Sequence, residues 1–69
     1  MTNTALLKSL LKKSGFKLEH IANRMGITRQ TLSRKVNNSA PFNQYEIASL
    51  CKLLGLEKWE EIETIFFCQ

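Results

Sequence analysis

Residues 18–37 read LEHIANRMGITRQTLSRKVN, and this stretch decides the fold. Apolar side chains recur at i, i+3, i+4 and i+7 from Leu18 to Met25, which is the spacing of a helix with one buried face. Gly26 suits a turn with positive φ. Thr28 can cap a second helix that reaches about Val36. The stretch therefore predicts two short helices joined by a sharp turn.

The two predicted helices can pack directly on each other. Ala22 is small, as a close crossing of two helices requires. Two short helices joined by a glycine-containing turn make a helix-turn-helix. The apolar residues expected to fill the wedge between them are Ile21, Met25, Ile27 and Leu32.

Another helix is predicted before this stretch. Thr2, Asn3 and Thr4 all offer side-chain oxygens that can cap it. Four leucines at positions 6, 7, 10 and 11 then lie on one stripe. Gly15 is suited to the left-handed conformation that closes a helix. This amphipathic helix is expected to pack its leucines into a bundle.

A fourth helix is predicted after a loop of residues 37–41. Asn43 can cap it, while Glu46 reaches back to the amide of the cap and completes a capping box. Phe42 can pack onto Ile47 across the first turn. Gly55 closes the helix as Gly15 closed the first one.

The C-terminal end is predicted less sharply. A last short helix is expected over about residues 57–64, with glutamates in its first turn where the helix dipole favours them. The ending Ile65-Phe66-Phe67 fits either a final helical turn or an extended tail. Together these elements predict an all-α fold, a compact bundle of four or five short helices in a single domain covering residues 1–69.

Charge is spread unevenly along the chain. The overall balance is +4, but residues 1–42 hold eight basic residues against one glutamate, a balance of +7. Residues 43–69 hold two lysines against five glutamates, a balance of −3. The basic part suits a polyanion such as nucleic acid. On charge alone, solvated lysines that keep the protein soluble explain it equally well.

Several classes of protein are disfavoured by composition. No apolar run is long enough for a transmembrane span or a secretory signal, so a cytoplasmic protein is expected. Cys51 and Cys68 are then expected to be reduced thiols. One histidine and two distant cysteines lack the spacing of a metal site. With no aspartate and no assembled acid, base or nucleophile, we expect no enzyme, no cofactor and no small-molecule ligand.

The second helix of the pair carries a polar stripe. Gln30, Ser33, Arg34 and Asn37 fall at i, i+3, i+4 and i+7, and Arg29 borders them. Arginine can donate two hydrogen bonds to guanine O6 and N7, and glutamine can bind adenine N6 and N7 in the same way. A solvated face would more often carry pairs of glutamate and lysine, and no acid lies between residues 24 and 43. The stripe predicts a helix that reads double-stranded DNA.

These features together resemble the Cro/repressor helix-turn-helix family of temperate bacteriophages and related bacterial regulators. The matching segments are residues 21–22, 25–27 and 28–33, followed by the loop with Pro41 and the helix over 44–54. The resemblance extends over roughly residues 6–56. It implies that the second helix of the pair, about residues 28–36, enters the major groove of DNA.

The resemblance also implies which residues contact DNA. Base edges are expected to be read by Arg29, Gln30, Ser33 and Arg34. The DNA backbone is expected to be bound by Lys17, Thr28, Thr31, Asn37, Asn38 and Asn43, together with the amides that open the helix at residue 18.

Two positions depart from the family pattern. Leu18 stands where the family often has glutamine, so no side-chain phosphate contact is expected from it. Lys35 stands where an apolar residue is common. We expect its aliphatic stem to lie along the core with the ammonium group in solvent, while Val36 takes over the packing.

The sequence thus predicts a sequence-specific transcriptional regulator, a repressor of the Cro type. Two alternatives remain open. The chain can be the antitoxin of a toxin-antitoxin pair, which uses the same fold. It can also be an interaction module whose apolar C-terminal end docks a partner protein, the basic face being incidental.

Two copies are expected to occupy one palindromic operator. Five large apolar residues crowd into positions 59–67, more than one face of a short helix can bury. Ile62 and Phe66 are expected to turn inward, whereas Trp59, Ile65 or Phe67 contribute to a symmetric patch between the two copies of a homodimer. The alternative is that all five complete the core of the monomer.

Overall fold

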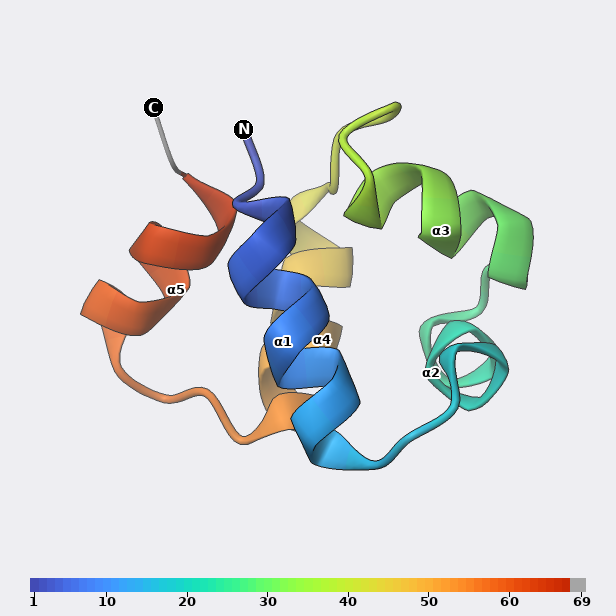
Figure 1. Cartoon of the computed structure of the whole chain (residues 1–69), viewed down its shortest axis with the longest axis horizontal. Coiled ribbons are helices and arrows are strands. Elements are labelled where there is room, and N and C mark those ends of the chain that lie inside the picture. The colour runs from blue at the N-terminus through green and yellow to red at the C-terminus, as the bar shows by residue number, and fades with distance from the viewer. Residues whose placement is uncertain (68–69) are drawn as a thin grey trace.

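Side-chain caps open three of the helices, and a glycine closes three of them. The computed structural model describes residues 1–67. Its helices, shown in Figure 1, are α1 Thr4–Ser14, α2 Leu18–Met25, α3 Arg29–Val36, α4 Gln44–Leu54 and α5 Trp59–Phe66. Residues 1–67 contain no strand. The predicted all-α fold is confirmed.

The predicted caps of α1, α3 and α4 are present as hydrogen bonds. Asn3 Oδ1 accepts from the amide of Leu6 at 3.1 Å, and Thr28 Oγ1 accepts from the amide of Thr31 at 3.1 Å. At α4 the Asn43 side chain accepts from the Glu46 amide at 2.8 Å while Glu46 Oε1 accepts from the Asn43 amide at 2.9 Å. Such caps each contribute about 1 kcal/mol, which matters in so small a domain.

The turn between α2 and α3 depends on Gly26. Its φ of 74° is one that residues with a Cβ rarely adopt. The chain closes back on α2, with the amide of Ile27 donating to the carbonyl of Ala22 at 3.0 Å. This turn sets the angle at which α3 leaves α2.

The last helix differs from the prediction at both ends. It begins at Trp59, two residues later than expected, and it continues to Phe66. Ile65 and Phe66 are 1% and 4% exposed. The helical period carries both side chains into the core, and their burial favours a final helical turn over an extended tail.

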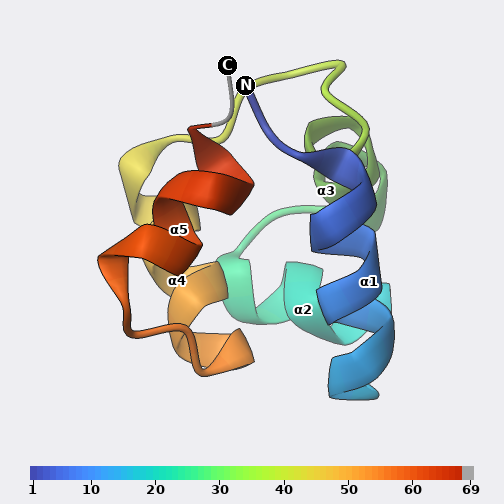
Figure 2. The same ribbon diagram turned by 60° about the vertical axis from the view of Figure 1, so that its left-hand side comes forward.

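The arrangement leaves the helix-turn-helix at one side of the molecule. In Figure 1, α5 lies on the left, α2 and α3 lie on the right, and α1 and α4 lie between them. The N-terminal segment lies beside the end of α5 (Figure 2), where the amide of Asn3 donates to the carbonyl of Ile65 at 2.6 Å. The buried apolar side chains are Leu7, Leu11, Ile21, Ala22, Leu32, Val36, Leu50, Cys51, Ile65 and Phe66.

Within residues 1–67, no helix has both the length and the apolar character needed to cross a membrane.

Candidate nucleic-acid interface

Helix α3 has one anchored face and one open face. Leu32 is fully buried and Val36 is 4% exposed, so both side chains hold the helix against the core. Burial of such side chains stabilises the fold by about 1.5 to 3 kcal/mol each. These two buried side chains therefore fix the direction in which the opposite face of α3 points, although that face does not belong to the core.

The open face carries the four residues expected to read bases. Arg29, Gln30, Ser33 and Arg34 line one surface hollow of about 380 Å³, and no other residue lines it. Arg29, Gln30 and Arg34 are exposed and Ser33 is half-buried. The prediction that these side chains share one face of α3 is confirmed, whereas their role in reading bases stays a prediction. The face offers two guanidinium groups, one amide and one hydroxyl, with no carboxylate among them.

Helix α2 supports α3 at close range. Ala22 is 1% exposed where α2 packs against α3 and α4. The predicted wedge is present, with Ile21 and Leu32 buried and Met25 and Ile27 partly buried against them. Leu18 packs against the same core, so its side chain stabilises the helix pair.

Lys35 does not hold its ammonium group in solvent, and that expectation was wrong. Its Nζ donates to Glu46 Oε2 on the first turn of α4, and the two side chains are only 15% and 8% exposed. Glu46 also accepts from the amide of Asn43. The Glu46 carboxylate on α4 thus accepts hydrogen bonds both from Lys35 of α3 and from the amide of Asn43 that caps α4.

The surroundings of Glu46 shift its ionisation in opposing directions. Burial by itself raises the pKa of the carboxyl. The hydrogen bonds from Lys35 and the Asn43 amide, together with the positive charge of Lys35, outweigh burial, and the pKa lies below the ordinary value of 4.5. The carboxyl of Glu46 is therefore ionised at neutral pH.

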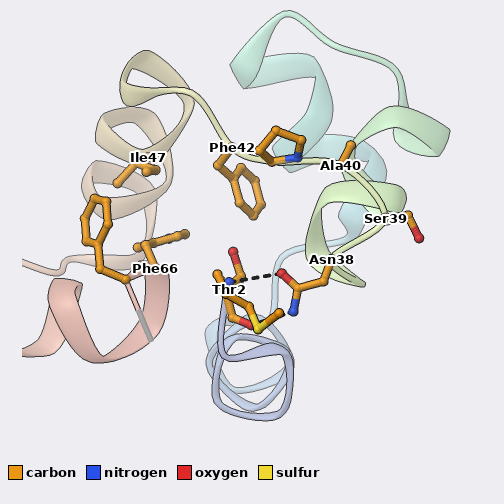
Figure 3. A pocket seen from close by; sticks show the side chains of 10 residues that line it. Thr2, Asn38, Ser39, Ala40, Phe42, Ile47 and Phe66 are labelled. Carbon is orange, nitrogen blue, oxygen red and sulfur yellow. Dashed lines mark hydrogen bonds between the residues drawn. The ribbon is translucent and has the colours of Figure 1, made fainter. Parts of the chain in front are cut away.

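Asn38 joins the end of α3 to the N-terminal segment (Figure 3). Its Oδ1 accepts from the amide of Thr2 at 3.0 Å, and its Nδ2 donates to the carbonyl of Thr2 at 2.6 Å and to Thr4 Oγ1 at 3.1 Å. Thr4 Oγ1 in turn donates to the carbonyl of Val36 at 2.8 Å. We call this set of bonds the Asn38 clamp.

The Asn38 clamp changes one expectation. Asn38 was expected to contact the DNA backbone, but both ends of its side-chain amide are hydrogen-bonded within the protein. A phosphate contact from this amide would have to break the clamp. In the structure the Asn38 side chain holds residues 2–4 against the end of α3, and a contact of Asn38 with DNA stays a prediction.

The other expected backbone contacts lie around the ends of α2, α3 and α4. Lys17 is exposed at the start of α2, where no side-chain cap bonds to the first amides. Thr28 Oγ1 also donates to Thr31 Oγ1 at 2.8 Å at the start of α3. Asn37 Nδ2 donates to the carbonyl of Ser33 at 2.9 Å. The oxygen of Asn43 caps α4, so only its Nδ2 can donate to a phosphate. Contacts to DNA by these five residues stay predictions.

The basic residues of the first 42 positions differ in whether their charge is free to attract DNA. Lys35 is neutralised by Glu46. The remaining basic residues of this part, all exposed, are Lys8, Lys12, Lys13, Lys17, Arg24, Arg29 and Arg34. The structure therefore leaves seven positive charges that can attract a polyanion through solvent.

Sequence reasoning missed the two links that hold α3 from outside the helix pair. Lys35 and Glu46 lie 11 residues apart, and Asn38 and Thr2 lie 36 apart, so helical periodicity relates neither pair. A lysine at an apolar position was the available signal for the first link. No local pattern marked the second.

The expected dimer surface is smaller than predicted. Ile65 is 1% exposed and belongs to the core, so it is not available to a partner. Phe66 turns inward as expected, and Ile62 is half-buried. Trp59 and Phe67 remain 59% and 48% exposed, with ring centroids 5.7 Å apart.

Metal ligands are not gathered at one place in the part of the chain that the structure describes. It contains no group of three or more His, Cys, Asp or Glu side chains that could hold a metal ion. Cys51 is a free, buried thiol, and burial raises its pKa. Cys68, also expected to be reduced, lies outside the described residues.

The geometry agrees with a comparison to known families. A profile of the Cro/C1-type HTH DNA-binding domain matches residues 6–65. The match includes all five helices except the two residues at the start of α1 and the last residue of α5. No curated protein and no solved structure matches the chain.

Proposed function

Since the chain belongs to the Cro/C1-type helix-turn-helix DNA-binding domains, we propose that it is a transcriptional repressor of the Cro type that inserts α3 into the major groove of its operator. The single observation that carries this proposal is the hollow shared by Arg29, Gln30, Ser33 and Arg34. These side chains project from the only face of α3 that the core leaves open. A cytoplasmic setting follows from such a target.

The proposal divides the interface into two kinds of contact. Gln30 and Arg34, one helical turn apart on the open face, discriminate between base pairs because their paired donors and acceptors match particular base edges. Lys17 at the start of α2 binds phosphate and carries no sequence information. Affinity and specificity can therefore be separated by mutation.

Selection from a pool of random duplexes, followed by sequencing, tests this division. Arg34→Ala and Gln30→Ala should each relax the preference at particular base pairs by about 1 to 3 kcal/mol. Lys17→Ala is the matched control and should weaken all sequences alike. If all three variants lose affinity without a change in base preference, α3 is not the reading helix.

The operator is expected to be palindromic, because two copies of the protein bind it. Trp59 and Phe67 are the exposed aromatic side chains that support a symmetric contact between the copies. The two α3 helices would then lie about 34 Å apart, one turn of the duplex. The contact is small, so the copies assemble on DNA rather than free in solution.

A further inference from the structure

An apolar groove lies between α1 and α5, apart from the face described above. It has a volume of about 460 Å³, within the range of about 300 to 1,000 Å³ seen for binding clefts. Leu6 and Leu10 of α1 line it together with Leu56 from the segment before α5. All three leucines are only half-buried, so the fold leaves part of their apolar surface open to this groove.

The rim of the groove is acidic. Glu60 and Glu61 line it from the first turn of α5, and both are exposed. Helix α5 contains three glutamates and no basic residue. The only ion pair within residues 1–67 joins Lys35 to Glu46, so neither Glu60 nor Glu61 forms an ion pair within the described chain, although Lys58 precedes them at the start of α5. A helix dipole favours acids in the first turn, but it does not place them beside half-buried leucines.

We propose that this groove, which we call the α1–α5 groove, binds an amphipathic helical segment of another protein that has aliphatic residues on one face and lysine or arginine beside them. Helices bind such grooves through apolar anchors at i, i+3, i+4 and i+7. The flanking cations of the segment meet the glutamates of the rim, and this complementarity selects a basic partner.

Charge also argues against a second copy of this chain in the groove. A symmetric contact would bring Glu60 and Glu61 of both copies together, and like charges across an interface cost free energy. Trp59 and Phe67, the residues of the proposed dimer contact, do not line the groove. The groove and the dimer contact are therefore separate surfaces.

The position of the groove allows both partners to bind at once. Helix α5 lies on the side of the molecule opposite α2 and α3 (Figure 1). A segment bound between α1 and α5 leaves the open face of α3 uncovered. The inference goes beyond the proposed repressor function, because a bound regulator could hold DNA on one side and a second protein on the other.

The first test uses three synthetic peptides of about 15 residues, a length at which isolated helices begin to form. One carries leucines at i, i+3, i+4 and i+7 with lysines beside them, the second replaces those lysines by glutamates, and the third replaces the leucines by alanines. Fluorescence anisotropy without DNA should show binding of the first peptide and at least about tenfold weaker binding of the other two. Equal affinity for the first two peptides would overturn the proposal.

The second test uses a matched pair of protein variants. Glu61→Lys reverses a charge on the rim, whereas Glu63→Lys makes the same change on α5 at a residue that does not line the groove. We expect Glu61→Lys to weaken the basic peptide about three- to thirtyfold, since it turns an exposed attraction into a repulsion. If both variants lose the same affinity for the basic peptide, the attraction is nonspecific and the proposal is overturned.

Two further measurements separate the possible failures. Both variants should still bind DNA, because neither residue lies on the open face of α3. If the wild-type protein binds DNA but does not bind the basic peptide, the groove proposal alone is refuted and the proposed repressor function stands. Sedimentation of the protein without DNA should show no self-association through the groove. A dimer that Leu10→Lys abolishes while Glu63→Lys leaves it intact would make a second copy the occupant, contrary to the proposal.

Discussion

Replacement of Lys35 by methionine should destabilise the domain more than the loss of a solvated lysine would, because the Lys35 side chain is only 15% exposed. Its ammonium group bonds to Glu46, whose side chain is 8% exposed. Lys35→Met keeps the aliphatic stem but leaves the carboxylate of Glu46 without its cation. The cost therefore comes from a buried charge that has lost its partner.

The magnitude follows from what Glu46 retains. Breaking a fully buried ion pair costs about 3 to 5 kcal/mol. Glu46 keeps its bond from the Asn43 amide, and both side chains retain some contact with solvent. We therefore expect a loss of about 2 to 3 kcal/mol, which lowers the melting temperature by roughly 8 to 24 °C in a domain of this size.

Urea denaturation followed by circular dichroism measures this loss, and a double-mutant cycle isolates the pair. In Glu46→Gln the side-chain oxygen can still accept from the Asn43 amide, so this variant should lose only about 1 kcal/mol. The combination Lys35→Met with Glu46→Gln removes both charges and should recover most of the loss. If the losses of the single variants simply add, the two residues are not coupled.

The difference between the wild type and Lys35→Met should depend on pH. The pKa of Glu46 is lowered in the folded protein, so its contribution is fully present above the unfolded value of about 4.5 and is lost as pH falls through the lower folded value. Without Lys35, the Glu46 carboxyl is still buried but has lost its cation, so its pKa should rise. The stability gap should thus begin to narrow as pH falls through the raised pKa of Glu46 in the variant, and it should close further as pH falls through the lowered pKa of Glu46 in the wild type. A gap of the same size at pH 7 and pH 3 would refute this reasoning.

Three other outcomes are expected. Affinity for the operator should fall by about 10³ to 10⁵ between 50 and 200 mM salt, as for complexes with about 6 to 10 phosphate contacts, and a salt-independent affinity would contradict the electrostatic account. Ala22→Leu should cost about 1 to 3 kcal/mol in thermal melting because the crossing of α2 and α3 has no room, whereas Ala48→Leu on the exposed side of α4 should be nearly neutral. The double variant Trp59→Ser with Phe67→Ser should form less of the two-to-one protein–duplex complex in sedimentation with the selected duplex, while its binding to a single half-site persists. A tight one-to-one complex of the wild-type protein on the full site would contradict the proposed dimer.

Local signals account for most of the fold that was predicted. The caps at Asn3, Thr28 and Asn43 and the glycine at position 26 act within four residues, so the sequence shows them directly. The apolar spacing that buries Ile21 is equally local. The pair of helices and the polar face of α3 could therefore be predicted before the structure was seen.

The end of α5 was beyond such local signals. No glycine or proline between residues 57 and 67 marks the end of a helix. Five large apolar side chains lie in positions 59–67, more than a small core can bury from one short helix. The tertiary neighbours of α5 decide which of them are buried, because α5 packs against α1 and Phe66 packs edge-on against Phe42. Ile65 is consequently lost to the expected dimer surface, and Trp59 and Phe67 remain on it.

The sequence alone determined the helix pair and the residues on the open face of α3, because helical period, caps and turns depend on neighbours a few positions away. Only the tertiary structure decided how that helix is held. Lys35 meets Glu46 on another helix, and Asn38 clamps Thr2 from 36 positions away. The α1–α5 groove likewise needs Leu6 and Leu10 from one end of the chain and Leu56 and the glutamates of its rim from the other. Contacts of this kind form only when the core brings distant segments together, and no local pattern records them.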